Sequence, residues 1–132
     1  MWDQRYTEEG FAYGTNPNDF LVETVSVLPP EGRILCLAEG EGRNAVYLAE
    51  KGFTVECVDA SAVGLEKAAA LAKSRSVTII TERADLKDYS IAADRYDGII
   101  SIFCHLPPPL QKHVHRQIYQ GLRHGGVFIL EG

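Results

Sequence analysis

The sequence predicts an α/β fold in which a parallel β-sheet carries helices on both of its faces. Short apolar runs alternate with alanine- and leucine-rich amphipathic segments along most of the chain. The clearest stretch is 33–59, which reads as an apolar run, a glycine-bearing turn, an amphipathic segment and a second apolar run that ends in a carboxylate. The strand-like runs look apolar on both faces, which is typical of parallel strands covered by helices on each side.

Capping residues and glycines divide the chain into these elements. Asn16-Pro17 offers a cap and a first-turn proline for one helix, Ser61 caps another, and Gly52 closes the helix between them. The triplet Pro107-Pro108-Pro109 opens the last helix, and Gly125-Gly126 turns into the last strand. The predicted helices cover 16–28, 43–51, 62–74 and 107–123, and the predicted strands cover 33–38, 53–58, 77–81, 96–103 and 127–130.

Size and composition restrict the possible classes of protein. The 132 residues make one domain, and a hydrophobic content of 45% is enough for a core. The formal charge of −5 argues against a general nucleic-acid surface, because such a surface needs basic residues to displace counterions from phosphates. No apolar run approaches the roughly 20 residues that span a bilayer. The 3 cysteines, all in apolar runs, favour the reducing cytoplasm over a disulfide framework.

The turn after the first predicted strand is typical of a nucleotide-binding site. Residues 40–45 match the dinucleotide fingerprint G-x-G-x-x-G/A, and Gly40 and Gly42 let the backbone bend and approach a ligand closely. The same turn also holds Glu39 and Glu41, and carboxylates are unfavourable beside a pyrophosphate. A ligand with a positive centre therefore suits this turn better than a dinucleotide.

Two further carboxylates follow the next two predicted strands. Asp59 ends the second strand, where it can accept hydrogen bonds from both hydroxyls of a ribose. Asp85 follows the third strand, where it can accept from an adenine amino group while the Leu86 N–H donates to a ring nitrogen. Together these residues predict a cleft for an adenosine that carries a cationic, phosphate-free group.

With these motifs the chain resembles the class I S-adenosylmethionine-dependent methyltransferases, most closely the small tellurite-resistance and thiopurine methyltransferase-like branch. The segment Glu-Gly-Glu-Gly-Arg-Asn at 39–44 is particularly similar to the tellurite-resistance branch. Cys36 and Ala38 stand where that family usually has an acid and a glycine, and the chain stops where the family normally continues with a helix and two more strands. The resemblance is clearest over 33–60, 83–86, 95–104 and 121–131.

The resemblance implies a single S-adenosyl-L-methionine-binding methyltransferase domain over 1–132, with an N-terminal lid and helix at 1–28 and a core at 33–131. That core is Rossmann-like, a doubly wound parallel sheet of strand order 3-2-1-4-5 in a three-layer α/β/α sandwich. The substrate would be a small molecule, such as a thiol or a chalcogen oxyanion like tellurite. The implied cofactor-binding residues are Ala38, Glu39, Gly40, Gly42, Asn44, Asp59, Ala60, Asp85, Leu86 and Phe103.

Several of these residues have a second interpretation. Asp59 could cap the helix after it, Asp85 could start the turn that follows it, and the glutamates of the glycine turn could form a solvated loop face. The N-terminal aromatic residues Trp2, Tyr6 and Tyr13 could anchor the segment by packing or could cover the cofactor as a lid.

No catalytic residue or metal site is assigned from the sequence. Cys36 and Cys57 are expected in the core on neighbouring strands, where burial raises the pKa of a thiol. Cys104-His105 lies at the carboxyl end of the fourth strand, and we expect a core cysteine beside a polar loop histidine rather than a nucleophile and base. His105 is the one candidate base if the methyl acceptor is an oxygen or a nitrogen.

Two other functions stay open at this point. One is a non-catalytic module, or a fragment, that keeps the cofactor fold without its substrate half, and the other is an NAD-binding domain. The last strand, with its apolar residues 127–130, is expected at an open sheet edge, where it would favour self-association.

Overall fold

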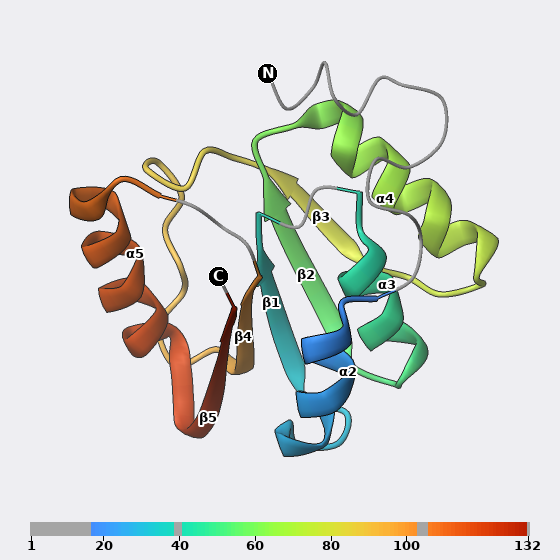
Figure 1. The fold of residues 1–132 in the computed structure, drawn as a ribbon, viewed down its shortest axis with the longest axis horizontal. Coiled ribbons are helices and arrows are strands. Elements are labelled where there is room, and N and C mark those ends of the chain that lie inside the picture. Colours follow the sequence, from blue (N-terminus) through green and yellow to red (C-terminus); the bar gives the residue numbers. More distant parts are fainter. Residues whose placement is uncertain (1–16, 39–40, 103–105, 132) are drawn as a thin grey trace.

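The computed structural model describes residues 17–38, 41–102 and 106–131. Within these ranges, five parallel strands form one sheet in the order β3-β2-β1-β4-β5 (Figure 1). The α/β class, the parallel sheet and its strand order are therefore confirmed. The strands are β1 (Arg33–Leu37), β2 (Thr54–Asp59), β3 (Ile80–Arg83), β4 (Tyr96–Ile102) and β5 (Leu122–Glu131).

Helices cover both faces of the sheet, as expected from strands that are apolar on both sides. One face is covered by α2, α3 and α4, and the other by α5 (Figure 1). The described helices are α2 (Asp19–Thr24), the short 3₁₀ helix η1 (Val25–Val27), α3 (Arg43–Glu50), α4 (Ala62–Ser74) and α5 (Pro108–Gly121). Among the described residues, no helix is both long and apolar enough to cross a membrane.

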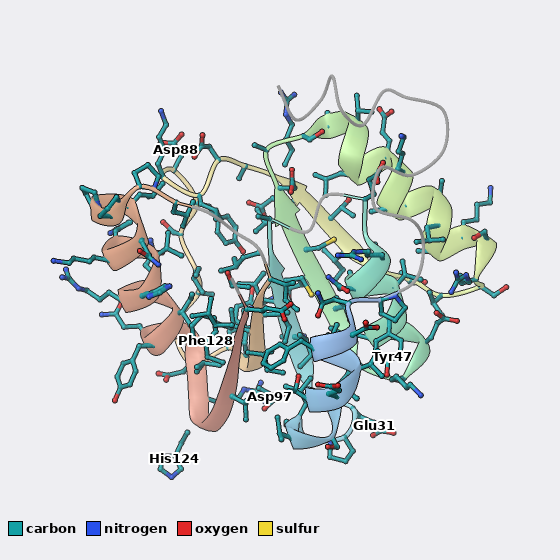
Figure 2. The ribbon with its side chains drawn as sticks, in the orientation of Figure 1. Glu31, Tyr47, Asp88, Asp97, His124 and Phe128 are labelled. Carbon is teal, nitrogen blue, oxygen red and sulfur yellow. The ribbon has the colours of Figure 1, made fainter. Side chains whose placement is uncertain are left out.

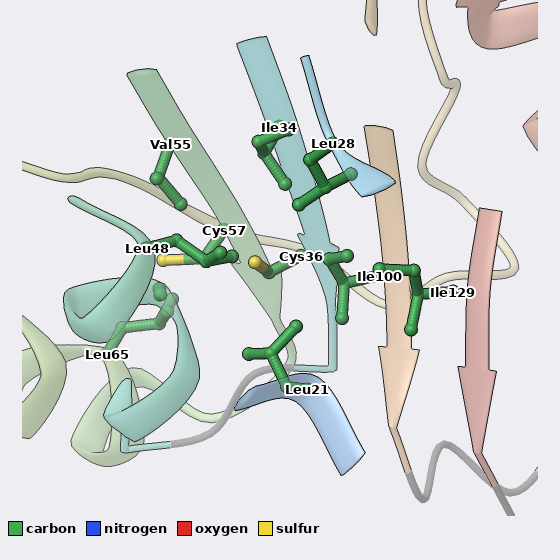
Figure 3. Close-up of a cluster of buried hydrophobic side chains, with 11 residues drawn as sticks. Leu21, Leu28, Ile34, Cys36, Leu48, Val55, Cys57, Leu65, Ile100 and Ile129 are labelled. Atoms are coloured by element: carbon green, nitrogen blue, oxygen red, sulfur yellow. The ribbon is translucent and has the colours of Figure 1, made fainter. Parts of the chain in front are cut away.

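Two apolar clusters fill the space between the sheet and these helices. On the first face, Leu21, Leu48 and Leu65 from the three helices meet side chains of the strands (Figure 3). Cys36 and Cys57 belong to this cluster, and they are partners in the register of β1 and β2. Both cysteines are buried on neighbouring strands, as predicted.

The second cluster lies between the sheet and α5. Val114 and Ile118 of α5 pack with Leu35, Val58 and Ile99 of three different strands. Since successive strand residues face opposite sides, Leu35 and Cys36 contribute to different clusters.

The predicted boundaries differ most from the structure in four elements: the first helix, β3, α5 and β5. The first helix is capped by Asn18, whose side chain accepts from the Leu21 N–H, and it gives way to η1 before Leu28. Strand β3 begins at Ile80 rather than at residue 77, because Val77 and Ile79 pack against α3 and α4 instead of joining the strand.

The remaining differences concern α5 and β5. Helix α5 ends at Gly121, where an added Cβ would lie 2.5 Å from a methyl carbon of Ile91. Strand β5 then starts at Leu122, which pairs with Tyr96, and a register shift separates this pair from the regular ladder that begins with Val127 opposite Gly98. The expected strand at 127–130 is therefore the regular part of a longer one.

Strand β3 departs from the expectation that every strand is buried on both faces. All four of its residues are exposed, and Ile80 keeps 50% of its surface accessible. The connection from β3 to β4, residues 84–95, contains turns and no helix. The sheet thus has a short, polar edge strand at this side, which is how natural sheets limit pairing with other chains.

Gly42 brings α3 and α4 unusually close together. It is the N-cap of α3 with a φ of 87°, in the left-handed region that favours glycine. A Cβ at this position would lie 2.5 Å from the Cβ of Ala68 and 2.8 Å from its Cα. The space into which a Cβ would point is therefore filled by α4, so helix packing as well as backbone conformation requires glycine at this position.

We expect Gly42→Ala to destabilise the domain by about 3 kcal/mol, since a left-handed alanine costs about 1–2 kcal/mol and overpacking adds about 1–3 kcal/mol. Gly52→Ala is the matched control, because Gly52 has a φ of 99° and nothing within 4 Å of an added Cβ. It should cost only the backbone term of about 1 kcal/mol. Urea unfolding of both variants measures the difference, and equal losses would contradict the close packing at Ala68.

Candidate functional site

The five parallel strands end at one edge of the sheet, and the candidate site residues lie along it. The last residues of β1, β2 and β3 are Leu37, Asp59 and Arg83, and Asp59 is paired with Arg83 in the register. In open parallel sheets, ligands bind outside this carboxyl edge. The topology therefore brings the glycine turn, Asp59 and Asp85 to the same edge.

The glycine turn begins with a strained residue. Ala38 is exposed and has a φ of 51°, which is the left-handed conformation. For a residue with a Cβ this conformation costs about 1–2 kcal/mol. The glycine usual at this position in the family that the sequence resembles would avoid that cost. Glu39 and Gly40, the next two predicted site residues, lie outside the described part of the chain.

Glu41 is buried, so the interpretation of this residue as part of a solvated loop face is wrong. Its side chain is 4% exposed, and its Oε2 lies 3.1 Å from Nζ of Lys67 on α4. An ion pair at this depth stabilises the charge of a carboxylate that would otherwise be costly to bury. The pair also joins the turn after β1 to the helix after β2, next to the Gly42–Ala68 contact.

Asn44 is a buried residue of the first turn of α3, and its side chain contacts the protein. Its Oδ1 accepts a hydrogen bond of 2.8 Å from the backbone N–H of Asn18. Asn18 in turn donates through its Nδ2 to Oε1 of Glu131, the last residue of β5, at 2.9 Å. This network ties the start of α2 to the glycine turn and to the carboxyl end of β5.

Asp59 orients the start of α4 without being its cap. Its Oδ1 accepts the N–H of Ser61 at 2.8 Å, while the Ser61 hydroxyl accepts the N–H of Gly64 at 3.0 Å and so caps the helix. The helix cap is therefore Ser61, as predicted, and the alternative of Asp59 as the cap is wrong. Ala60 is exposed at the edge, and its carbonyl accepts a hydrogen bond from Nε of Arg83.

Asp85 starts a turn, which was the second interpretation of this residue from the sequence. Its Oδ1 accepts the N–H of Lys87 at 3.0 Å, and its backbone carbonyl accepts from Asp88 and Tyr89. The carboxylate is nevertheless exposed, so the turn does not remove it from solvent. Leu86 is buried in the cluster under α5 and anchors this turn to the sheet.

The backbone brings Asp59 and Asp85 near one another. The N–H of Ala84 donates to the carbonyl of Asp59 at 2.9 Å, and Asp85 is the next residue. Phe103, Cys104 and His105, which follow β4 in the sequence, lie outside the described residues. Within the described ranges, no group of three or more histidine, cysteine or acidic residues could hold a metal ion.

The family described as "Methyltransferase domain" matches residues 34–126 of this chain. The chain belongs to this family. Among curated proteins, a 2-heptyl-1-hydroxyquinolin-4(1H)-one methyltransferase of Mycobacteroides abscessus is 28% identical over 102 residues, which are 75% of this chain and 45% of the relative.

Solved structures with the same arrangement include other methyltransferases. An S-adenosylmethionine-dependent methyltransferase of Mesorhizobium loti is 29% identical with a TM-score of 0.68, over 79% of this chain and 48% of that one. PH0226 of Pyrococcus horikoshii is 28% identical with a TM-score of 0.72, over 82% of this chain and 50% of PH0226. TehB of Haemophilus influenzae shares the fold with a TM-score of 0.75. It is 22% identical, over 83% of this chain and 38% of TehB. This methyltransferase domain thus spans about half the length of such relatives.

The methyltransferase domain also has a polar cluster that the sequence did not reveal, on the face of the sheet covered by α5. Glu56 of β2 contacts Arg33 at 2.8 Å, Arg95 at 3.2 Å and the hydroxyl of Tyr96 at 2.9 Å. Burial alone would raise the pKa of Glu56, but these hydrogen bonds and charges leave it lowered. Burial and the hydrogen bond to Glu56 raise the pKa of Tyr96. The cluster joins β1, β2 and β4 within the sheet and lies away from its carboxyl edge.

We expect Asn18→Ala to lower stability by about 2 kcal/mol, because it removes the cap of α2 and the hydrogen bond to a charged partner. Asn18→Asp keeps a capping oxygen but places a second carboxylate against Glu131, and it should also destabilise the domain at neutral pH. Adding Glu131→Gln to Asn18→Asp restores a donor and should recover most of the loss. Urea unfolding measures all three, and a double variant no better than Asn18→Asp would contradict the network.

Proposed function

We propose that this methyltransferase domain binds S-adenosyl-L-methionine and transfers its methyl group to a small molecule. The observation that carries the proposal is the placement of Asp59 and Asp85 at the ends of adjacent strands, with the glycine turn at the end of the next strand. The family match over 34–126 supports the reaction class. A coclaurine N-methyltransferase solved with S-adenosylhomocysteine has the same fold at 21% identity, with a TM-score of 0.72.

The chemistry of the residues fits this cofactor. Carboxylate oxygens can only accept hydrogen bonds, and the ribose hydroxyls and the adenine amino group can donate them. In the proposed assignment Asp59 and Ala60 hold the ribose, and Asp85 and Leu86 hold the adenine. The methionine half is assigned to Ala38, Glu39, Gly40, Gly42 and Asn44, and Phe103 completes the proposed set.

When bound, the cofactor supplies an electrophilic methyl group on a positively charged sulfur. A lone pair of the acceptor displaces the sulfur in line, so the protein needs no covalent nucleophile. The contribution of this chain is alignment, which is worth about 7–11 kcal/mol in favourable cases. Asp59 and Asp85 would anchor the nucleoside and thereby fix where the methyl group points.

We propose a thiol or a chalcogen oxyanion such as tellurite as the class of acceptor. Sulfur, selenium and tellurium atoms are soft nucleophiles that need no general base, which fits a site for which the sequence assigns no catalytic residue. An oxygen or nitrogen acceptor would need a base, for which His105 stays the candidate.

Calorimetric titration tests the cofactor assignment. We expect S-adenosylhomocysteine to bind and NAD not to bind. Asp59→Ala should weaken S-adenosylhomocysteine binding by about 10- to 100-fold, the equivalent of about 1.5–3 kcal/mol for a hydrogen bond to a charged group. Asp88→Ala is the control, because Asp88 is an exposed acid on the same connection as Asp85 (Figure 2). Binding of NAD without S-adenosylhomocysteine would reverse the assignment.

We also propose that the 132-residue chain self-associates through β5. This strand has β4 as its one neighbour in the described sheet, and Leu130 keeps 46% of its surface exposed. Unpaired N–H and C=O groups on such an edge can pair with a second chain.

Sedimentation velocity at increasing concentration should therefore show a dimer or larger species. Leu130→Lys should shift the distribution toward monomer, since a lysine in an edge strand opposes pairing. Val27→Lys is the control, because Val27 is an exposed apolar residue of η1. A monomer at all concentrations would contradict the proposal.

A further inference from the structure

Among the described residues of the glycine turn, one buried side-chain oxygen has no hydrogen-bond partner. Glu41 is 5% exposed as a residue, and its Oε1 is buried with no hydrogen-bond partner in the part of the chain that the structure describes. Burying an acceptor without a hydrogen bond costs about 1–3 kcal/mol, so native proteins leave few such atoms unless a ligand or a water completes them. This oxygen therefore indicates a missing donor at the turn.

The other half of the Glu41 carboxylate is firmly held. Its Oε2 is paired with Nζ of Lys67 at 3.1 Å, and the side chain of Lys67 is itself only 21% exposed. Next to this pair, Ala68 of α4 occupies the space beside Gly42. Two consecutive residues of α4 thus hold two consecutive residues of the turn, and this fixes where Oε1 lies.

The chemistry of the proposed ligand selects the donor. In the proposed function, which this inference rests on, the turn holds the methionine half of the cofactor, and the nucleoside lies at Asp59 and Asp85. The methionine half has an ammonium group, which donates, and a carboxylate, which can only accept. A carboxylate oxygen such as Oε1 can therefore pair with the ammonium group and not with the carboxylate.

We infer that Glu41 is a cofactor-binding residue whose Oε1 accepts a hydrogen bond from the ammonium group of the methionine half. Lys67 is a positioning residue that holds the Glu41 side chain through Oε2. Lys67 also compensates the carboxylate charge, so that it can remain buried before the ligand arrives. The turn would in this way select ligands that carry an amino acid over nucleosides that carry phosphates.

The test compares two ligands on matched variants by calorimetry. The ligands are S-adenosylhomocysteine and its des-amino analogue, which keeps the carboxylate and lacks the ammonium group. The double variant Glu41→Leu with Lys67→Met removes the acceptor and leaves no unpaired buried charge, and such replacements of a buried pair are often neutral in stability. We expect S-adenosylhomocysteine to bind this variant about tenfold or more weakly than wild type. Affinity for the analogue should change less than about twofold.

An ion pair at the far ends of α3 and α4 provides the control. Glu50, the last residue of α3, and Arg75, the C-cap of α4, are in contact at 3.1 Å and are both about one-third exposed. Glu50→Leu with Arg75→Met should leave the ratio of the two affinities unchanged. Glu41→Gln keeps the side-chain volume and is the second variant if the double variant unfolds. It should lower the ratio of the affinity for S-adenosylhomocysteine to the affinity for the des-amino analogue.

The outcomes separate this inference from the proposed function. If wild type binds both ligands and the Glu41 variants keep the wild-type affinity ratio, Oε1 is completed by a water and the inference is overturned. Equal losses for both ligands would overturn it too, because they would assign the pair a purely structural role. If wild type binds neither ligand, the proposed function itself fails.

Discussion

The contact of α4 with the glycine turn is the constraint on which the candidate site depends. Because Gly42 lies against Ala68, helices α3 and α4 can approach only if residue 42 has no side chain. Helix α4 begins directly after Asp59 and Ser61, so the same helix that fixes the turn also fixes the acid at the end of β2. The two parts of the edge thus have a set separation before any ligand binds, and this preorganisation lowers the cost of binding.

Much of the fold was predictable because it depends on local patterns. The strand ends at Asp59 and the cap at Ser61 follow from apolar runs and short-range hydrogen bonds, which the sequence displays directly. The start of β3 was not predictable in this way. Val77 and Ile79 have the β-branched side chains that are common in strands, but both pack against α3 and α4 in the segment before the strand begins.

In the candidate site, too, local patterns were predictable from the sequence and long-range contacts were not. The edge residues Asp59 and Asp85 could be found from their places after strand-like runs. The partner of Glu41 is 26 positions away in the chain, and Asn18 and Glu131 are separated by 113 positions. No sequence pattern connects such residues, because only the folded topology brings α4 to the turn and β5 to α2.

The connection from β3 to β4 crosses the sheet without a helix, and this affects how firmly the two ends of a bound nucleoside would be held. Asp59 belongs to an interior strand, whereas Asp85 is held by a short turn and the burial of Leu86. Opening such a turn costs less free energy than disrupting an interior strand. With the proposed assignment of Asp59 to the ribose and Asp85 to the adenine, the sugar would therefore be held more firmly than the base, and changes in the nucleobase would be tolerated more readily than changes in the sugar.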